Sequence, residues 1–149
     1  RLTKGGGGDA PAHLPPYRKT QSMTPISPNA APAAIGPYSQ AIAINGLLFV
    51  SGQLPIDPAT GAFPSDDPVD QMRQCLKNIA AIAAAAGTDL HRTVKTTVLV
   101  RDLSRFAEIN AAYAEAFVAP YPARATFEVS ALPKGAQIEV DAVIALPGA

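Results

Sequence analysis

The sequence predicts one α+β domain, a two-layer sandwich in the order ββαβαββ in which two helices cover one face of a mostly antiparallel sheet. Its 149 residues, 48% of them hydrophobic, suffice for one well-buried core and are too few for two ordinary domains. Along the chain, the hydrophobic period changes between that of a strand and that of a helix. Two windows have the helical period, and two helices of that length can cover one face of a sheet.

Residues 1–23 differ in composition from the rest of the chain. They include four consecutive glycines at 5–8 and three prolines, and they show no apolar periodicity. The segment also lacks the apolar middle of a secretory signal. We therefore expect a flexible tail or an added leader at 1–23, with Met23 as a candidate start, and a single domain at 24–149.

The first two strands of the predicted domain form a hairpin. Ser39–Ile44 and Leu47–Ser51 flank the dipeptide Asn45-Gly46. Asn-Gly readily takes the positive φ angles of a tight turn, so the two segments are expected to pair.

Both helices are marked by residues that favour helix ends. The Asp-Asp-Pro at 66–68 supplies a capping carboxylate, negative charge in the first turn and an early proline, and Gly87 ends the pattern. The apolar face between them consists of Met72, Leu76, Ile79, Ile82 or Ala83, and Ala86. Asp102 or Ser104 opens the second helix, which should end before the prolines at 120 and 122.

The remaining strands follow from two-residue alternation. One strand is predicted over 94–101, between the helices. Segments 123–129 and 138–144 alternate in the same way, and we expect them to form a closing hairpin around Leu132–Gly135. A tight register in that hairpin would bring Glu128 roughly opposite Glu139.

The same alternation predicts which side chains lie away from the helices. If Ala125 and Phe127 face the helices, then Arg124, Thr126 and Glu128 face the other way. The final strand should point Gln137, Glu139 and Asp141 to that side as well. We therefore expect a polar second sheet face, on which Arg124 could separate the carboxylates of Glu128 and Glu139.

Arg124 and Glu139 are the candidate catalytic residues. Arg124 is a charged residue in an otherwise apolar strand pattern, and a guanidinium can grip a carboxylate with two parallel hydrogen bonds. A carboxylate such as Glu139 can orient a water molecule or take a proton. Together the two residues predict a site for a small acid.

Composition argues against several classes of protein. No apolar run approaches the roughly 20 residues of a membrane span. The single cysteine, Cys75, excludes an intrachain disulfide and fits the reducing cytoplasm, and His13 and His91 lack metal-ligand spacing. The tail carries four of the twelve basic residues and one of the twelve acidic residues, which leaves the domain with eight and eleven. A mildly acidic domain is a poor electrostatic partner for nucleic acid.

Five short motifs resemble those of one family, in order and spacing, over about residues 24–146. They are Gly36-Pro37-Tyr38-Ser39-Gln40-Ala41, Ser51-Gly52-Gln53, Phe106-Ala107-Glu108-Ile109-Asn110, Pro122-Ala123-Arg124 and Ile138-Glu139-Val140. The chain thus resembles the RidA (YjgF-type) family, also labelled L-PSP endoribonucleases. The resemblance implies a chorismate-mutase-like fold and a homotrimer with three clefts between subunits. It also implies hydrolysis, without metal or cofactor, of enamine/imine intermediates such as 2-iminobutanoate and 2-iminopropanoate to 2-oxo acids and ammonia.

The resemblance also implies roles for individual residues. Arg124 corresponds to the arginine that binds the substrate carboxylate, and Glu139 to the glutamate that orients the attacking water. The positions that match the cleft lining, and are predicted to bind substrate, are Tyr38, Ser51, Asn110 and Thr126, the last at a position often occupied by cysteine.

Other interpretations stay open from the sequence alone. Arg124 could instead form a salt bridge between subunits, and Asn110 could be a polar residue on a helix face. Cys75 is expected to be buried and not a nucleophile. Besides the deaminase, two functions remain: a small-carboxylate-binding or stress-protective protein without turnover, and an endoribonuclease, which the acidic domain does not favour.

Overall fold

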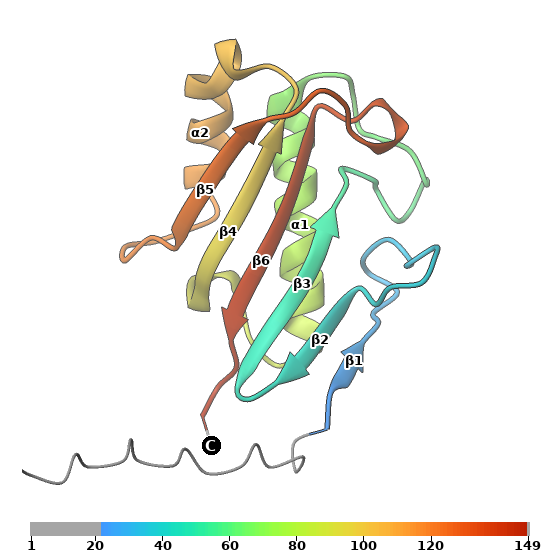
Figure 1. The fold of residues 1–149 in the computed structure, drawn as a ribbon, viewed down its shortest axis with the longest axis vertical. Helices are drawn as coiled ribbons and strands as arrows, with labels where there is room; N and C mark the ends of the chain where they lie inside the picture. Colours follow the sequence, from blue (N-terminus) through green and yellow to red (C-terminus); the bar gives the residue numbers. More distant parts are fainter. Residues whose placement is uncertain (1–21, 149) are drawn as a thin grey trace, which may run out of the picture.

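The computed structural model describes residues 22–148, so most of the predicted tail at 1–23 lies outside the described residues. Within 22–148 the chain forms six strands and two α-helices (Figure 1). The strands are β1 (Thr24–Ile26), β2 (Ala41–Ile44), β3 (Leu47–Gln53), β4 (Thr93–Val100), β5 (Ala123–Glu128) and β6 (Ile138–Ala145). The helices are α1 (Pro68–Ala85) and α2 (Phe106–Ala114).

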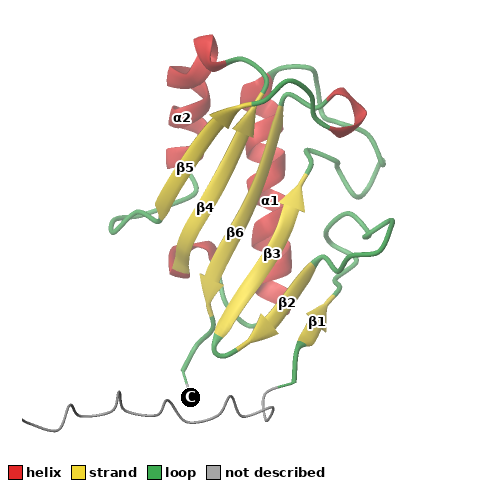
Figure 2. Ribbon diagram, viewed as in Figure 1, coloured by secondary structure: helices red, strands yellow, loops and turns green. Residues whose placement is uncertain are grey.

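The strands form one sheet in the order β1-β2-β3-β6-β4-β5, with both helices on the same face (Figure 2). Every neighbouring pair is antiparallel except β4 and β5, which are parallel. The predicted α+β class, the two-layer arrangement and the mostly antiparallel sheet are confirmed. The short edge strand β1 was not predicted, because three residues are too few to show a periodicity.

The core lies between α1 and the helix-covered side of the sheet. Leu48, Val98, Val140 and Ile144 from the strands are at most 1% exposed, as are Ile79 and Ile82 from α1. The apolar face that the sequence predicts for α1 is buried in this layer, apart from the half-buried Ala86. Cys75 is also buried there, as expected.

The predicted closing hairpin is wrong. β4 lies between β5 and β6, so the two segments do not pair with each other. Glu139 is opposite Leu99 of β4, not opposite Glu128. The physical reason is that β5 follows α2, and a strand that returns through a helix can pair in parallel with the strand before that helix.

The predicted orientation of β5 is also wrong. Arg124 and Thr126 are in register with Thr96 and Val98, whose side chains are buried beneath the helices. Paired residues of neighbouring strands point to the same face, so Arg124, Thr126 and Glu128 lie on the helix-covered side. The open face of β5 carries Ala125 and the 55% exposed Phe127 instead.

For β6 the predicted orientation is confirmed. Ile138 and Val140 are buried under the helices, and Glu139 and Asp141 lie on the open face. That face is less polar than predicted, because it also carries Phe49 of β3 and Phe127 of β5, which are 45% and 55% exposed.

Asp67 fixes the start of α1. Its side chain accepts a hydrogen bond of 2.7 Å from the Val69 backbone N–H, and it lies 3.6 Å from Arg105, just before α2. The carboxylate thus satisfies a free amide at the helix N-terminus and connects the two helices.

Replacing Asp67 by alanine should lower the free energy of unfolding by about 1 kcal/mol, because an N-terminal cap is lost. Urea unfolding followed by circular dichroism measures the change. The matched control is Asp66→Ala, which removes a neighbouring carboxylate without removing the cap. Equal stability of the two variants would show that Asp67 does not cap α1.

Candidate functional site

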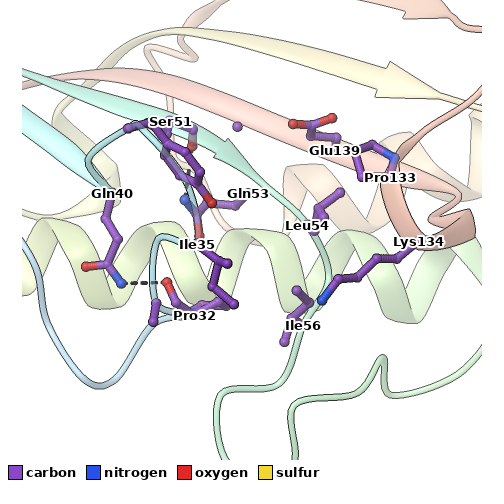
Figure 3. A pocket seen from close by; sticks show the side chains of 13 residues that line it. Pro32, Ile35, Gln40, Ser51, Gln53, Leu54, Ile56, Pro133, Lys134 and Glu139 are labelled. Carbon is purple, nitrogen blue, oxygen red and sulfur yellow. Dashed lines mark hydrogen bonds between the residues drawn. The ribbon is translucent and has the colours of Figure 1, made fainter.

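A cavity of about 600 Å³ opens beside the ends of β3 and β6. Much of its lining is apolar, with Ile35, Leu54, Ile56 and Pro133 among the residues that enclose it. Among the described lining residues, Glu139 is the one acid and Lys134 the one base. Figure 3 shows the Lys134 side chain extending toward Ile56, while the Glu139 carboxylate lies apart from the Lys134 amine. Such an enclosure suits a small ligand with few charged groups.

The carboxylate of Glu139 lies against the backbone of Gly52. A Cβ atom at Gly52 would overlap Glu139 Oε1 and lie only 3.1 Å from its carboxyl carbon. The register between β3 and β6 shifts between Val50 and Gln53, which marks a bulge at this point. Gly52 is therefore required for close approach of the carboxylate to the strand.

Burial raises the pKa of Glu139 above its ordinary value, and the negative charge of Asp141 raises it further. Asp141 itself accepts a hydrogen bond of 3.0 Å from the Thr97 backbone N–H. No hydrogen bond holds the Glu139 carboxylate among residues 22–148, so it remains available to a water molecule or a ligand.

The segment before β2 forms one wall of the cavity and is anchored by Gln40. Gln40 is 3% exposed, and its Nε2 donates to the Pro32 carbonyl at 2.5 Å, a contact drawn in Figure 3. Ser51 Oγ donates to the Ser39 carbonyl at 2.5 Å. Ser51 thus lines the cavity, but its proton is used to hold this wall, which leaves the hydroxyl as an acceptor only.

Tyr38 also lines the cavity and is 54% exposed. The turn before it depends on Gly36, which has a φ of 131°, a value that side-chain-bearing residues rarely adopt. Tyr38 N donates to the Gly36 carbonyl at 2.9 Å, which fixes where the tyrosine leaves the turn.

The opposite wall is held by a side chain that the sequence did not single out. Asn78, 1% exposed on α1, donates from Nδ2 to the carbonyls of Leu54 and Ile56 at 3.1 and 2.9 Å. Gln74 donates to the Asn78 Oδ1 at 2.9 Å, so the amide is held from both ends. Three amides at helical spacing, Gln71, Gln74 and Asn78, were the available signal, because all three are buried and buried amides need partners.

Arg124, Asn110 and Thr126 are not part of this cavity. They lie on the helix-covered side at the outer edge of the sheet, on β5 and α2. Arg124 Nη1 donates to Asn110 Oδ1 at 2.6 Å, and the guanidinium lies over the rings of Phe106 and Tyr113. The Thr126 hydroxyl oxygen is buried and has no hydrogen-bond partner within 22–148. In one chain, therefore, the two candidate catalytic residues lie on opposite faces of the sheet.

Arg124 is an exposed cation with no acidic partner in the described part of the chain. The ion pairs within residues 22–148 involve Arg73 and Arg105, and none involves Arg124. The predicted position between Glu128 and Glu139 is therefore wrong. An exposed guanidinium held by a neutral amide and two rings keeps its charge for an external anion.

Neither a metal nor Cys75 is supported as part of this site. No group of three or more His, Cys, Asp or Glu side chains within residues 22–148 is arranged to hold a metal ion. Burial raises the pKa of the Cys75 thiol well above its ordinary value, with a further contribution from the charge of Glu139, so the reactive thiolate is disfavoured.

Within the described part of the chain, no helix has the length and apolarity needed to cross a membrane.

Comparison with known proteins identifies the family. The family model described as Endoribonuclease L-PSP matches residues 28–146. A RutC family protein, y4sK, of Sinorhizobium fredii is 66% identical over 83% of this chain and 98% of its own length. The human 2-iminobutanoate/2-iminopropanoate deaminase is 45% identical over 79% of this chain and 86% of its own length.

Solved structures agree with the sequence comparison. The YjgF gene product of E. coli is 42% identical, with a TM-score of 0.77 over 82% of this chain and 98% of that one. E. coli TdcF, solved with bound serine, is 38% identical, with a TM-score of 0.77 over 83% of this chain and 99% of that one. The chain therefore belongs to the YjgF/RidA family, as its motifs predicted.

Proposed function

We propose that this protein hydrolyses 2-imino acids, of the 2-iminobutanoate and 2-iminopropanoate type, to 2-oxo acids and ammonia. The observation that carries the proposal is a pair of complementary half-sites within residues 22–148. One is the Arg124 guanidinium, which forms no ion pair there, and the other is the half-buried Glu139 carboxylate, which lies beside a small cavity and accepts no hydrogen bond there. The first suits the carboxylate of such a substrate, and the second suits the water that attacks it.

Arg124 binds the substrate carboxylate in this mechanism. A planar guanidinium presents two parallel N–H groups that match the two oxygens of a carboxylate. Asn110 occupies part of Nη1, which leaves the edge formed by Nε and Nη2 for the ligand. The carboxylate is held next to the reacting carbon, so this contact also fixes the orientation of the imine.

Glu139 activates water. It takes a proton as the water oxygen bonds to C2 of the protonated imine, and the C=N bond becomes a C–N single bond. Glu139 then returns that proton to nitrogen, the C–N bond breaks, and the C2–O bond becomes the ketone as the hydroxyl loses its proton to solvent. One protonated imine and one water thus give one 2-oxo acid, one ammonia and one proton, and the last two combine in solvent as an ammonium ion. The raised pKa of Glu139 makes its carboxylate a better base than an exposed glutamate.

The complete site requires two subunits. Because Arg124 and Glu139 lie on opposite faces of the sheet, a substrate contacts both only when β5 of one subunit approaches the cavity of the next. A cyclic homotrimer with three such clefts meets this requirement, and each interface contributes one arginine and one glutamate. The exposed Phe49 and Phe127 on the open sheet face favour such an assembly.

The names of relatives support the substrate class. The human relative at 45% identity is named a 2-iminobutanoate/2-iminopropanoate deaminase, and an Arabidopsis thaliana relative at 48% identity is named Reactive Intermediate Deaminase A, chloroplastic. TdcF of E. coli was solved with serine, a small molecule with a carboxylate next to a nitrogen-bearing carbon. A carboxylate-binding protein without turnover would also use Arg124 to bind the ligand, but it would not need Glu139 to activate water.

Arg124→Ala should lower kcat/KM for 2-iminobutanoate by a factor that corresponds to about 2–4 kcal/mol, because the substrate carboxylate loses its charged partner. Arg124→Lys should not restore activity, since an ammonium lacks the planar fork. The measurement is ammonia release from imine generated in the assay. The matched control is Lys77→Ala, which removes an exposed cation from α1. Wild-type activity in either Arg124 variant contradicts the assignment.

The acidic limb of the pH–activity profile should report the protonation of Glu139. Its pKa is raised by burial and by Asp141, so activity should fall as pH drops through this raised value. Asp141→Asn removes the like charge, lowers the pKa of Glu139 and should move the acidic limb to lower pH. The asparagine keeps an oxygen for the Thr97 hydrogen bond.

Steady-state rates measured between about pH 4 and pH 8, roughly the range in which a raised carboxyl pKa lies, give the shift of the acidic limb. Asp89→Asn, which removes another exposed carboxylate, serves as the control. An unchanged acidic limb in Asp141→Asn would mean that Glu139 is not the titrating base.

A further inference from the structure

Three residues of α2 meet the single guanidinium of Arg124. Its central carbon lies 4.8 Å from the centre of the Tyr113 ring and 5.3 Å from that of Phe106. Asn110 accepts its hydrogen bond at 2.6 Å. Phe106, Asn110 and Tyr113 are spaced by four and three residues, so they lie on one face of the helix over successive turns.

Both ring distances are within the range of cation–π attraction, which requires a cation within about 6 Å of a ring centroid. The guanidinium of an exposed arginine otherwise samples many rotamers, and a ligand must pay the entropy of fixing it. Two rings and an amide restrict that motion before the ligand arrives.

Tyr113 is itself held in place. It is 5% exposed, its hydroxyl lies 2.7 Å from Thr96 Oγ1, and its ring centre lies 4.6 Å from that of Phe117. Thr96 is the residue of β4 that is in register with Arg124. The same pair of strands therefore positions the arginine and anchors the ring that supports it.

Neutral groups hold Arg124, and this matters for ligand binding. A glutamate or aspartate in place of the rings would fix the guanidinium as well, but it would compete with the substrate carboxylate for the same N–H groups. Ring faces attract the cation without occupying its in-plane donors. The edge formed by Nε and Nη2 has no hydrogen-bond partner among residues 22–148.

We propose that Phe106 and Tyr113 are positioning residues that hold the Arg124 guanidinium with its Nε and Nη2 edge free for the carboxylate of the substrate. The inference rests on the proposed function for the identity of the carboxylate. It adds that the affinity for 2-oxo and 2-imino acids depends on two aromatic side chains that do not touch the reacting atoms.

The test measures binding separately from turnover. Calorimetric or NMR titration of the full-length protein with 2-oxobutanoate, the product, gives the dissociation constant Kd without any reaction. Phe106→Leu and Tyr113→Leu should each raise Kd for 2-oxobutanoate and KM for the imine about three- to tenfold, with a smaller change in kcat. Tyr113→Phe and Phe106→Tyr keep a ring and should retain most of the affinity.

A double-mutant cycle separates positioning from general damage to the fold. In the Arg124→Ala background, Tyr113→Leu and Phe106→Leu should have almost no further effect on Kd, because there is no guanidinium left to orient. Phe106 is partly exposed at the start of α2, so Phe106→Leu should disturb the fold less than Tyr113→Leu. If Tyr113→Leu unfolds, the cycle with Phe106→Leu still decides the question.

Unchanged Kd in both leucine variants overturns the inference, and so does an equal loss of affinity with and without Arg124. Wild-type protein that binds no 2-oxobutanoate also overturns it. Wild-type protein that binds 2-oxobutanoate but releases no ammonia from the imine contradicts the proposed function alone, and the cycle then still decides the role of the two rings.

Discussion

The parallel pairing of β5 with β4 is the constraint on which the arrangement of the site depends. It places Arg124 on the same side of the sheet as Thr96 and Val98, beneath α2. The antiparallel pairing of β6 with β4 places Glu139 opposite Leu99, on the open side. A sheet is impermeable to side chains, so one chain cannot bring these two groups to the same small molecule.

The two halves of the proposed site are built by different physical means. The carboxylate half depends on close contact between Glu139 and the backbone of Gly52, where a β-bulge and the lack of a side chain leave room for the carboxylate. Burial and the neighbouring Asp141 raise the pKa of Glu139, which means that its ionised form is held at a cost in folded-state stability. That cost arises as pH rises from the ordinary carboxyl pKa through the raised one, since the folded chain binds the proton more tightly than the unfolded chain does.

The cation half avoids such a cost. Arg124 is exposed, so its charge stays hydrated, while Phe106, Asn110 and Tyr113 restrict its motion without neutralising it. A buried arginine without an acidic partner would be strongly destabilising. An exposed arginine supported by aromatic rings stays charged and oriented in the absence of ligand, with little loss of folding stability.

Much of this could be predicted from the sequence, because local signals decide it. Asp67 and Pro68 mark the start of α1, Asn45-Gly46 marks the hairpin, and the alternation in β6 gives the side on which Glu139 lies. Arg124, Glu139, Tyr38 and Ser51 were selected from motifs, and the structure places the last three at one cavity.

The rest could not be predicted, because it depends on non-local pairing. The side chains of β5 alternate in the same way whichever face is covered, and the choice is made only when β5 pairs with β4. The partners of Arg124 lie on α2, and the amide of Asn78 reaches a loop more than twenty residues away in sequence. Contacts between residues so far apart in sequence leave no periodic pattern in either segment.

Complementation between two inactive variants tests the central claim most directly. Arg124→Ala and Glu139→Ala chains, each inactive alone, are co-expressed in equal amounts and purified together, without separating mixed trimers from trimers of one variant. If each site takes its arginine and its glutamate from different subunits of a trimer, every mixed trimer has one intact site. The preparation should then recover about a quarter of the wild-type activity per chain, since random assembly leaves about one site in four intact. Mixed trimers that remain inactive, or a wild-type chain that is fully active as a monomer, would contradict a site shared between subunits.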